Sequence, residues 1–245
     1  MATRRMWKDL LMSAVPSRYP NEVELAGREN LDAEHVQRYD SKMDADSDAE
    51  VALLRTLGLG EESTVTEFGS GTGQVSLAAA ATGARVTAVD VSLPMLTYLD
   101  AKMAERGLTN VTLVHQGFLS YSPTGDAVDF LYSRYALHHL PDFWKAIALN
   151  RLRRLLKPGG VFRLWDVVYD FSPQEADQRL EAWCAQGGSS VDGEWSRAEF
   201  EEHVRDEYST FRWILEPLIR RADFDIADVQ VTPDTFDAKY VLRAV

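Results

Sequence analysis

Apolar positions along the chain follow two alternating spacings, one typical of helices and one typical of strands. From Asp46 to Leu57 they recur three or four residues apart, which predicts a helix that ends at the glycines of LGLGEE. Short runs rich in β-branched residues then alternate with helical stretches as far as Tyr169. This alternation predicts a parallel sheet with right-handed crossovers and helices on both faces.

The same pattern places the individual elements. Strands are expected at 64–68, 85–90, 111–118, 127–134 and 161–169. Helices are expected between them at 74–83, 95–105 and 141–156, with Ser92 as an N-cap for the second of these. The end of the chain, 225–245, predicts two strands joined across a Pro-Asp turn.

Two segments stand outside this alternation. Residues 1–45 are polar and mixed, with a helical pattern in LDAEHVQRYDSKM, and we expect a lid there rather than a domain. Residues 46–245 are expected to form one α/β domain. Within it, three helical stretches at 171–221 are long for an ordinary crossover, so they predict a helical cap over the carboxyl ends of the strands, where open α/β sheets bind ligands.

The composition limits the kinds of partner that we expect this chain to bind. The 245 residues suit one domain with a generous core, and a formal net charge of −12 without a basic patch disfavours nucleic acids and anionic membranes. The single cysteine, Cys184, excludes an intrachain disulfide and a zinc cluster of thiolates, and no metal site is expected. No apolar run of about 20 residues occurs, so we expect a cytoplasmic protein. The oligomeric state is not encoded in these features.

The stretch EFGSGTG places glycines at 69, 71 and 73, where a strand must turn into a helix. Without Cβ atoms a ligand can touch the main chain, and the helix N-terminus favours a phosphate or carboxylate. Asp90, at the tip of the next strand, is placed to accept hydrogen bonds from ribose hydroxyls. The spacing is not the GxGxxG of dinucleotide sites, and no GK[ST] follows. A nucleotide-like ligand of another kind is indicated.

Several ordered motifs resemble those of the class I S-adenosylmethionine-dependent methyltransferases. EFGSGTG is similar to their first motif, AVDVSLPML to the second, YSRYALHHLPD to the fourth-strand segment and LLKPGG to the turn before strand five. The likeness covers about residues 50–168 and the terminal hairpin, and it is closest to the small-molecule branch that includes quinone-biosynthesis methyltransferases. It implies an α/β, Rossmann-like fold with a seven-stranded, mostly parallel sheet, an antiparallel last strand, and S-adenosyl-L-methionine as cofactor.

The resemblance also implies roles for matching residues. Glu67 would lie near the methionine part of the cofactor, and Asp90 would bind the ribose. Ser133 and Arg134 would border the reacting methyl group, while Tyr39 would close over the cofactor or else serve as a core tyrosine. The cofactor-binding residues expected in this way are Tyr39, Glu67, Gly69, Ser70, Gly71, Gly73, Asp90, Val91, Met95, Gly117, Phe118, Ser133 and Arg134.

One position departs from the family pattern. After strand three the family commonly has a Gly-Asp pair whose carboxylate receives the adenine amino group, whereas here Gly117 is followed by Phe118. The adenine contact must therefore come from Gln116 or a main-chain carbonyl, with Phe118 stacking on the base, unless the adenine pocket is looser.

Methyl transfer is an in-line displacement, so alignment of the acceptor and exclusion of water supply most of the catalysis. A base is needed only where the acceptor must lose a proton early. The candidates at the ends of strands four and five are Tyr135, His138 and Asp166. His138 and its neighbour His139 have a structural alternative, and Asp166 could instead cap the following turn.

The function expected is methyl transfer from S-adenosylmethionine to an O, N or C atom of a small molecule. Two alternatives are a methyltransferase directed at tRNA or protein, and a nucleotide-binding protein of this fold that transfers no methyl group. The acidic, aromatic cap suits an amine or a heteroaromatic acceptor, although Arg197, Arg205 and Arg212 leave an acidic substrate open.

Overall fold

A central sheet organises the computed structural model, which describes residues 16–27, 29–43, 46–188, 195–234 and 236–245. Its order is β3-β2-β1-β4-β5-β8-β7, with the short β6 paired to β5. The first five strands run parallel, and β8 runs antiparallel to both β5 and β7. The predicted fold class is confirmed. The strands are β1 Thr64–Phe68, β2 Arg85–Asp90, β3 Val111–His115, β4 Val128–Arg134, β5 Leu156–Tyr169, β6 Thr210–Phe211, β7 Phe224–Val231 and β8 Asp237–Ala244.

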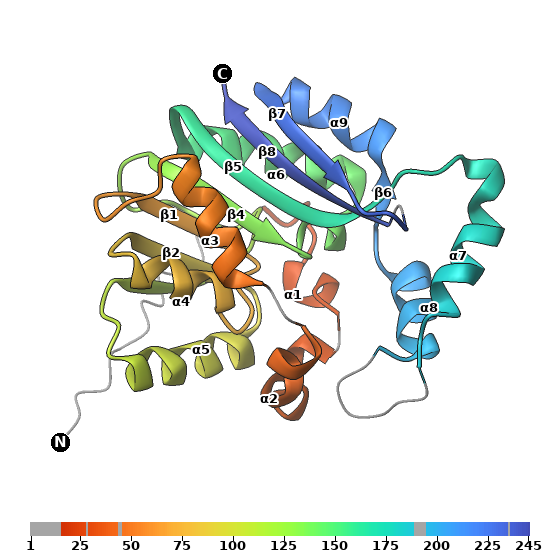
Figure 1. Cartoon of the computed structure of the whole chain (residues 1–245), viewed down its shortest axis with the longest axis horizontal. Helices are drawn as coiled ribbons and strands as arrows, with labels where there is room; N and C mark the ends of the chain where they lie inside the picture. Colours follow the sequence, from red (N-terminus) through yellow and green to blue (C-terminus); the bar gives the residue numbers. More distant parts are fainter. Residues whose placement is uncertain (1–15, 28, 44–45, 189–194, 235) are drawn as a thin grey trace.

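Helices cover both faces of the sheet (Figure 1). One face packs against α3 (Ser47–Thr56), α4 (Gln74–Ala81) and α5 (Leu93–Arg106), and the other against α6 (Asp142–Leu155) and α9 (Arg212–Arg221). Their apolar residues form two buried clusters, one on each face, and their burial is the main stabilising term of such a fold.

Local signals define α5. The Ser92 hydroxyl accepts from the Met95 N–H at 3.2 Å, Pro94 lies in the first turn, and Gly107 ends the helix with a φ of +66°. This places the N-terminus of α5 directly after the tip of β2, so the Asp90 side chain lies at the carboxyl edge of the sheet.

The largest differences from the predicted boundaries lie at the start of β5 and the end of β3. The helix predicted at 141–156 ends at Leu155, because Leu156 pairs with Val128 and begins an extended segment that runs into β5. The third strand ends at His115, so Gly117 and its neighbours belong to the loop after β3, where the Gly117 N–H donates to the Ser120 hydroxyl. This second shift places the expected adenine corner on a loop.

Lid and cap elements lie at the carboxyl edge of the sheet (Figure 1). The lid consists of α1 (Glu22–Leu25), the 3₁₀ turn η1 (Glu29–Leu31) and α2 (Ala33–Lys42), and the cap of η3 (Pro173–Glu175), α7 (Ala176–Cys184) and α8 (Arg197–Asp206). Residues 1–15 of the predicted lid fall outside the described residues. No helix in the described part of the chain is long and apolar enough to cross a membrane.

The third helical stretch expected in the cap, α9, packs elsewhere. Leu215 and Ile219, one turn apart, are buried in the cluster shared with α6, β5 and β7. Side chains four residues apart lie on one helix face, so α9 has an apolar face directed at the sheet. The cap over the strand ends is therefore formed by α7 and α8.

Candidate functional site

Three adjoining cavities lie where the carboxyl ends of the strands meet the lid. Two of them, of about 80 and about 40 Å³, border the loop between β1 and α4, and we call them the loop cavities. The third, of about 690 Å³, lies between the lid and the cap, and we call it the large cavity. Tyr39 and Tyr135 line all three, so these two rings separate the glycine loop from the large cavity.

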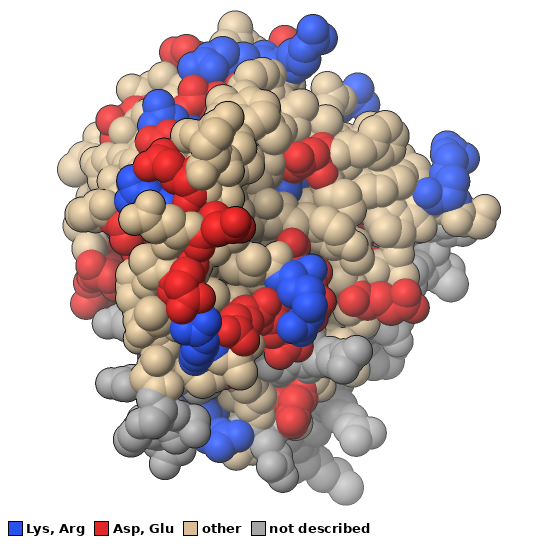
Figure 2. Space-filling view, turned by 90° about the vertical axis from the view of Figure 1, so that its right-hand side faces the viewer, with Lys and Arg blue, Asp and Glu red and all other residues tan. Residues whose placement is uncertain are grey.

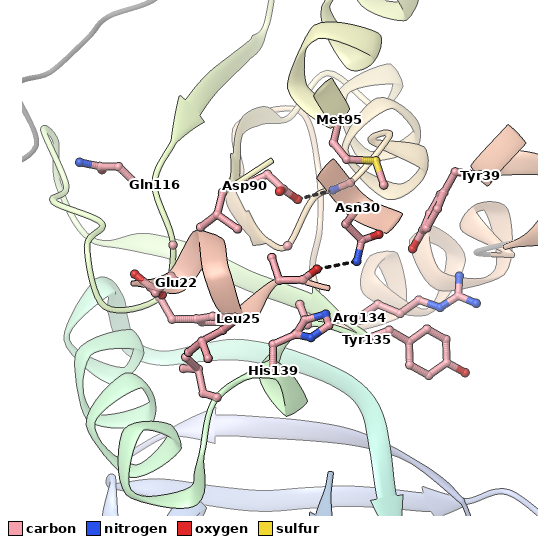
Figure 3. A pocket seen from close by; sticks show the side chains of 18 residues that line it. Glu22, Leu25, Asn30, Tyr39, Asp90, Met95, Gln116, Arg134, Tyr135 and His139 are labelled. Atoms are coloured by element: carbon pink, nitrogen blue, oxygen red, sulfur yellow. Dashed lines mark hydrogen bonds between the residues drawn. The ribbon is translucent and has the colours of Figure 1, made fainter. Parts of the chain in front are cut away.

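Asp90 lies in the wall of the first loop cavity with its carboxylate held by the main chain (Figure 3). One oxygen accepts from the Gly71 N–H and the other from the Ser92 N–H, each at 2.7 Å. Burial raises the pKa of Asp90 above its ordinary value, although these N–H donors lower it. Each oxygen keeps a second lone pair, so Asp90 is a fixed acceptor for ligand hydroxyls.

Glu67 lines the second loop cavity and is buried. Its carboxylate accepts from the Ser76 hydroxyl. Burial, with repulsion from Asp90, raises the pKa of Glu67 to about 8, while Arg134 and the Ser76 bond act in the opposite sense. A cationic group bound in this cavity would favour the ionised carboxylate.

Other predicted cofactor residues also line the loop cavities. Val91 and Met95 flank Asp90 in the first, Ser70 lines the second, and Gly69 and Gly71 border both. Arg134 borders both as well, with its guanidinium carbon 4.1 Å from the centroid of the Trp165 ring. In Figure 3 Arg134 and Met95 approach the cavity from different elements.

Gly73 and Ser133 line none of the three cavities, and their ligand contacts stay predictions. Gly73 has a φ of +76°, and a Cβ there would lie 2.2 Å from Leu99 Cδ1, so close packing of α5 requires the glycine. Ser133 is fully buried on β4. Successive strand residues point to opposite faces, so its neighbour Arg134 reaches the cavity while Ser133 faces the interior.

The loop after β3, where the sequence predicts the adenine contact, borders the first loop cavity. Phe118 lines the first loop cavity, but its ring stacks on Phe68, with centroids 5.3 Å apart and planes 15° apart. The Gln116 side-chain oxygen accepts from the Ser122 N–H at 3.2 Å. Figure 3 shows the Gln116 side chain directed away from the cavity. Both side chains are engaged within the protein.

A carboxylate from the lid occupies this corner instead. Glu22 accepts from the Leu119 N–H at 2.9 Å, and its second oxygen accepts from the Ser120 N–H at 3.0 Å and the Ser120 hydroxyl at 2.8 Å. A Cβ on Gly117 would lie 2.4 Å from Glu22 Oε1. Sequence reasoning missed Glu22 because no motif links α1 to a loop almost a hundred residues later.

Of the predicted catalytic residues, His138 lines the large cavity and Asp166 lies behind it. His138 Nδ1 contacts the Asp166 carboxylate, and Nε2 lies 2.9 Å from Glu207 Oε2. Burial lowers the pKa of His138, but the two carboxylates outweigh it and raise the pKa to about 10. The catalytic role of His138 stays a prediction. Asp166 lines none of the three cavities, and its carboxylate lies behind the His138 ring.

A different carboxylate, Asp237 at the start of β8, faces the large cavity beside Tyr135. Burial, together with repulsion from Asp234 and Asp166, raises the pKa of Asp237 to about 7, and the nearby Tyr135 hydroxyl acts in the opposite sense. Tyr135 has a φ of +48°, a left-handed conformation rare for a large side chain. The strained residue and the perturbed carboxylate meet at the junction of the cavities, as is common at active sites.

The large cavity is acidic and aromatic. No Lys or Arg is found among its described lining residues. Its carboxylates are Glu24, Glu199, Glu202, Asp206, Glu207 and Asp237. Its aromatic rings, apart from histidines, belong to Tyr39, Tyr135, Trp183, Trp195, Phe200 and Tyr208. Figure 2 shows acidic side chains gathered on this side of the molecule with scattered basic ones among them. A cation or a neutral amine fits this lining better than an anion.

Comparison with known proteins identifies a matching family model and proteins of similar sequence. Residues 65–160 match a family model described as a methyltransferase domain. An uncharacterised methyltransferase of Anoxybacillus flavithermus is 27% identical over 209 residues, a match that covers 82% of this chain and 92% of the relative.

Two solved structures have a similar fold. An S-adenosylmethionine-dependent methyltransferase from Clostridium acetobutylicum superposes with a TM-score of 0.65 at 16% identity, covering 86% of this chain and 97% of the other. Magnesium protoporphyrin IX methyltransferase from Synechocystis, solved with bound SAH, gives a TM-score of 0.59 at 16% identity, covering 89% and 86%. Residues 65–160, which match the family model, contain the glycine loop and Asp90.

Proposed function

Because this chain is an enzyme with a methyltransferase domain and the fold of the class I S-adenosylmethionine-dependent enzymes, we propose that it methylates a nitrogen atom of a small organic amine. The cofactor is S-adenosylmethionine, which when bound supplies an electrophilic methyl group on a sulfonium. Asp90 would accept hydrogen bonds from the ribose hydroxyls of the cofactor. Glu67 would lie beside the cationic methionine end, and the main chain at Gly71 would contact the cofactor. The proposed acceptor site is the large cavity.

The lining of the large cavity carries this proposal. Its six carboxylates and six aromatic rings, without a Lys or Arg among the described lining residues, suit an ammonium or an amine on an organic skeleton. The volume of about 690 Å³ falls in the usual range of about 300–1,000 Å³ for small-molecule sites. A phosphate-rich polymer would be repelled by such a lining, and the net charge of −12 acts in the same direction.

Tyr135 and Asp237 are the proposed acceptor-binding pair. An ammonium cannot attack until it loses a proton, because its nitrogen has no lone pair. The Asp237 carboxylate, with a pKa of about 7, can hold the ammonium and then take its proton, which leaves the lone pair free. The Tyr135 hydroxyl, which lies beside this carboxylate, would help to orient it. Tyr135 also lines the loop cavities, so the freed nitrogen faces the cofactor side.

Lid movement is part of the proposal. The first loop cavity, about 80 Å³, is well below the roughly 300 Å³ at the lower end of small-molecule sites, because Glu22 and Leu25 of α1 fill its side. A whole cofactor therefore requires α1 to move outward. Closure behind it would exclude water from the reacting atoms.

The acceptor class is tested by initial rates of S-adenosylhomocysteine formation with matched compounds. We expect 2-phenylethylamine and related arylalkylamines to be methylated, while the isosteric alcohols react more slowly and the isosteric carboxylates do not react. Product mass and fragmentation locate the methyl group on nitrogen. Equal rates for the alcohol or carboxylate would contradict the assignment of an amine, without contradicting methyl transfer.

Replacing Glu22 with alanine should speed cofactor entry. The change removes three hydrogen bonds that hold α1 on the loop after β3, so the association rate of S-adenosylhomocysteine in stopped-flow fluorescence should rise several-fold. Glu24→Ala, on the same short helix but not bonded to that loop, is the matched control. A fall in affinity with an unchanged association rate would instead show that Glu22 itself holds the adenine.

A further inference from the structure

Two imidazoles and a carboxylate converge at the wall of the large cavity. We propose that His138, His203 and Glu207 bind a divalent transition-metal ion. His138 Nε2 lies 2.9 Å and His203 Nδ1 2.5 Å from the same oxygen, Glu207 Oε2. One donor atom from each residue lies within 4.8 Å of the other two. The proposal does not depend on the identity of the methyl acceptor.

The spacing fits one ion after small side-chain adjustments. Zinc bonds to imidazole nitrogen and carboxylate oxygen are about 2.0–2.2 Å long, so neighbouring ligand atoms around one ion lie roughly 3–3.5 Å apart. The distances from His138 and His203 to Glu207 are slightly shorter than this. A short outward rotation of the side chains would therefore admit the ion between them.

The donor set selects the class of metal. Two imidazole nitrogens and one carboxylate oxygen suit Zn²⁺ and Fe²⁺, whereas Mg²⁺ and Ca²⁺ prefer oxygen ligands. Three protein ligands leave at least one coordination position, and the large cavity is the open side of the cluster. A water molecule or a donor atom of a bound small molecule can occupy that position.

Each imidazole is also held from behind, as metal-binding histidines usually are. Nδ1 of His138 contacts Asp166, which in turn accepts from the His138 N–H at 3.0 Å and the Val167 N–H at 2.8 Å. Nε2 of His203 lies 2.8 Å from the Ser209 hydroxyl. In both rings one nitrogen is engaged by another residue, and the other lies close to Glu207 Oε2.

The ligands come from two parts of the fold. His138 lies in η2 (Leu137–His139), directly after β4, while His203 is in α8 and Glu207 follows at its C-terminal end. Residues four apart share one helix face, so the last two present their donors together. A bound ion would therefore tie the cap to the carboxyl edge of the sheet, beside the main-chain bond from the Tyr208 N–H to the His138 carbonyl at 3.0 Å.

The test measures metal retention by the whole chain. Protein stripped with a chelator is given one equivalent of Zn²⁺, desalted and analysed by inductively coupled plasma mass spectrometry, and Co²⁺ is used separately as a spectroscopic probe. We expect about one zinc per chain, a zinc-dependent rise in the unfolding temperature, and visible Co²⁺ bands. His203→Gln and Glu207→Gln should lose all three. Asp166→Asn should weaken zinc binding by about 10- to 100-fold.

Glu201→Gln is the matched control, because Glu201 lies on α8 but bonds Arg197 at the surface. It should retain zinc as the unmodified chain does. Circular dichroism and S-adenosylhomocysteine binding show whether each variant is folded, and the two substitutions at separate ligands guard against one misfolding. The proposal would be overturned if the unmodified chain lost its zinc on desalting, or if the His203 and Glu207 variants retained zinc equally well. The three side chains would then interact only with one another.

Discussion

Gly71→Ala should weaken S-adenosylhomocysteine binding about 10- to 100-fold and leave the fold nearly intact. A Cβ at position 71 would lie 3.9 Å from Tyr39 Cε1, an ordinary contact, and it meets no other protein atom within 4 Å. The methyl group would point into the space between the glycine loop and the lid, where we propose that the cofactor binds. Forcing an extra methyl group into a filled site costs about 1–3 kcal/mol, and each 1.4 kcal/mol is about a tenfold change in Kd.

The backbone gives this prediction its control. Gly71 has a φ of +51°, so alanine also adds a conformational cost of roughly 1–2 kcal/mol that has nothing to do with the ligand. Gly107→Ala adds a similar cost at a φ of +66°, with open space around its Cβ. Titration calorimetry and denaturant unfolding of both variants separate the two terms. Equal affinities in the two variants would mean that the cofactor does not contact the loop at Gly71.

The fold could be predicted from sequence because its signals are local. Strand and helix spacings, the Ser92 cap and the glycine stops each depend on a few adjacent residues, and together they determine the parallel core. The sequence prediction was wrong where tertiary contacts determine the local structure. Leu156 continues as strand because Val128 pairs with it, and α9 joins the core because its apolar face meets the sheet.

The residues of the candidate site fall into the same two groups, those recognisable from local sequence and those brought together only by tertiary contacts. Asp90, Gly71 and Met95 belong to contiguous motifs, and the structure places all three around one cavity. Glu22 and Asp237 come from the two ends of the chain and approach the site only through folding. Sequence spacing does not reveal such long-range neighbours, and the chain has other acidic residues that spacing alone cannot separate from these two.

Asp237→Asn should reduce kcat/KM for an amine acceptor by about 10²- to 10⁴-fold, the usual contribution of a general base. Asparagine keeps the shape and can still accept from the Tyr135 hydroxyl, but it cannot take a proton. S-adenosylhomocysteine affinity should be unchanged, because Asp237 lines the large cavity and neither of the loop cavities. Initial rates over a range of acceptor concentrations give kcat and KM separately.

The pH dependence gives this assignment its sharpest test. Because burial raises the pKa of Asp237 to about 7, kcat/KM should rise with pH through about 7, and this limb should vanish in Asp237→Asn. Asp234→Asn removes a repelling charge, so it should retain activity with the limb moved to lower pH. The free energy of unfolding should change with pH in the opposite direction to kcat/KM. The raised pKa of Asp237 favours folding while the carboxyl group is protonated, so the unmodified chain loses stability as pH rises from about 4 to about 7, and Asp237→Asn should lose less. A limb retained in Asp237→Asn would assign proton removal to another group.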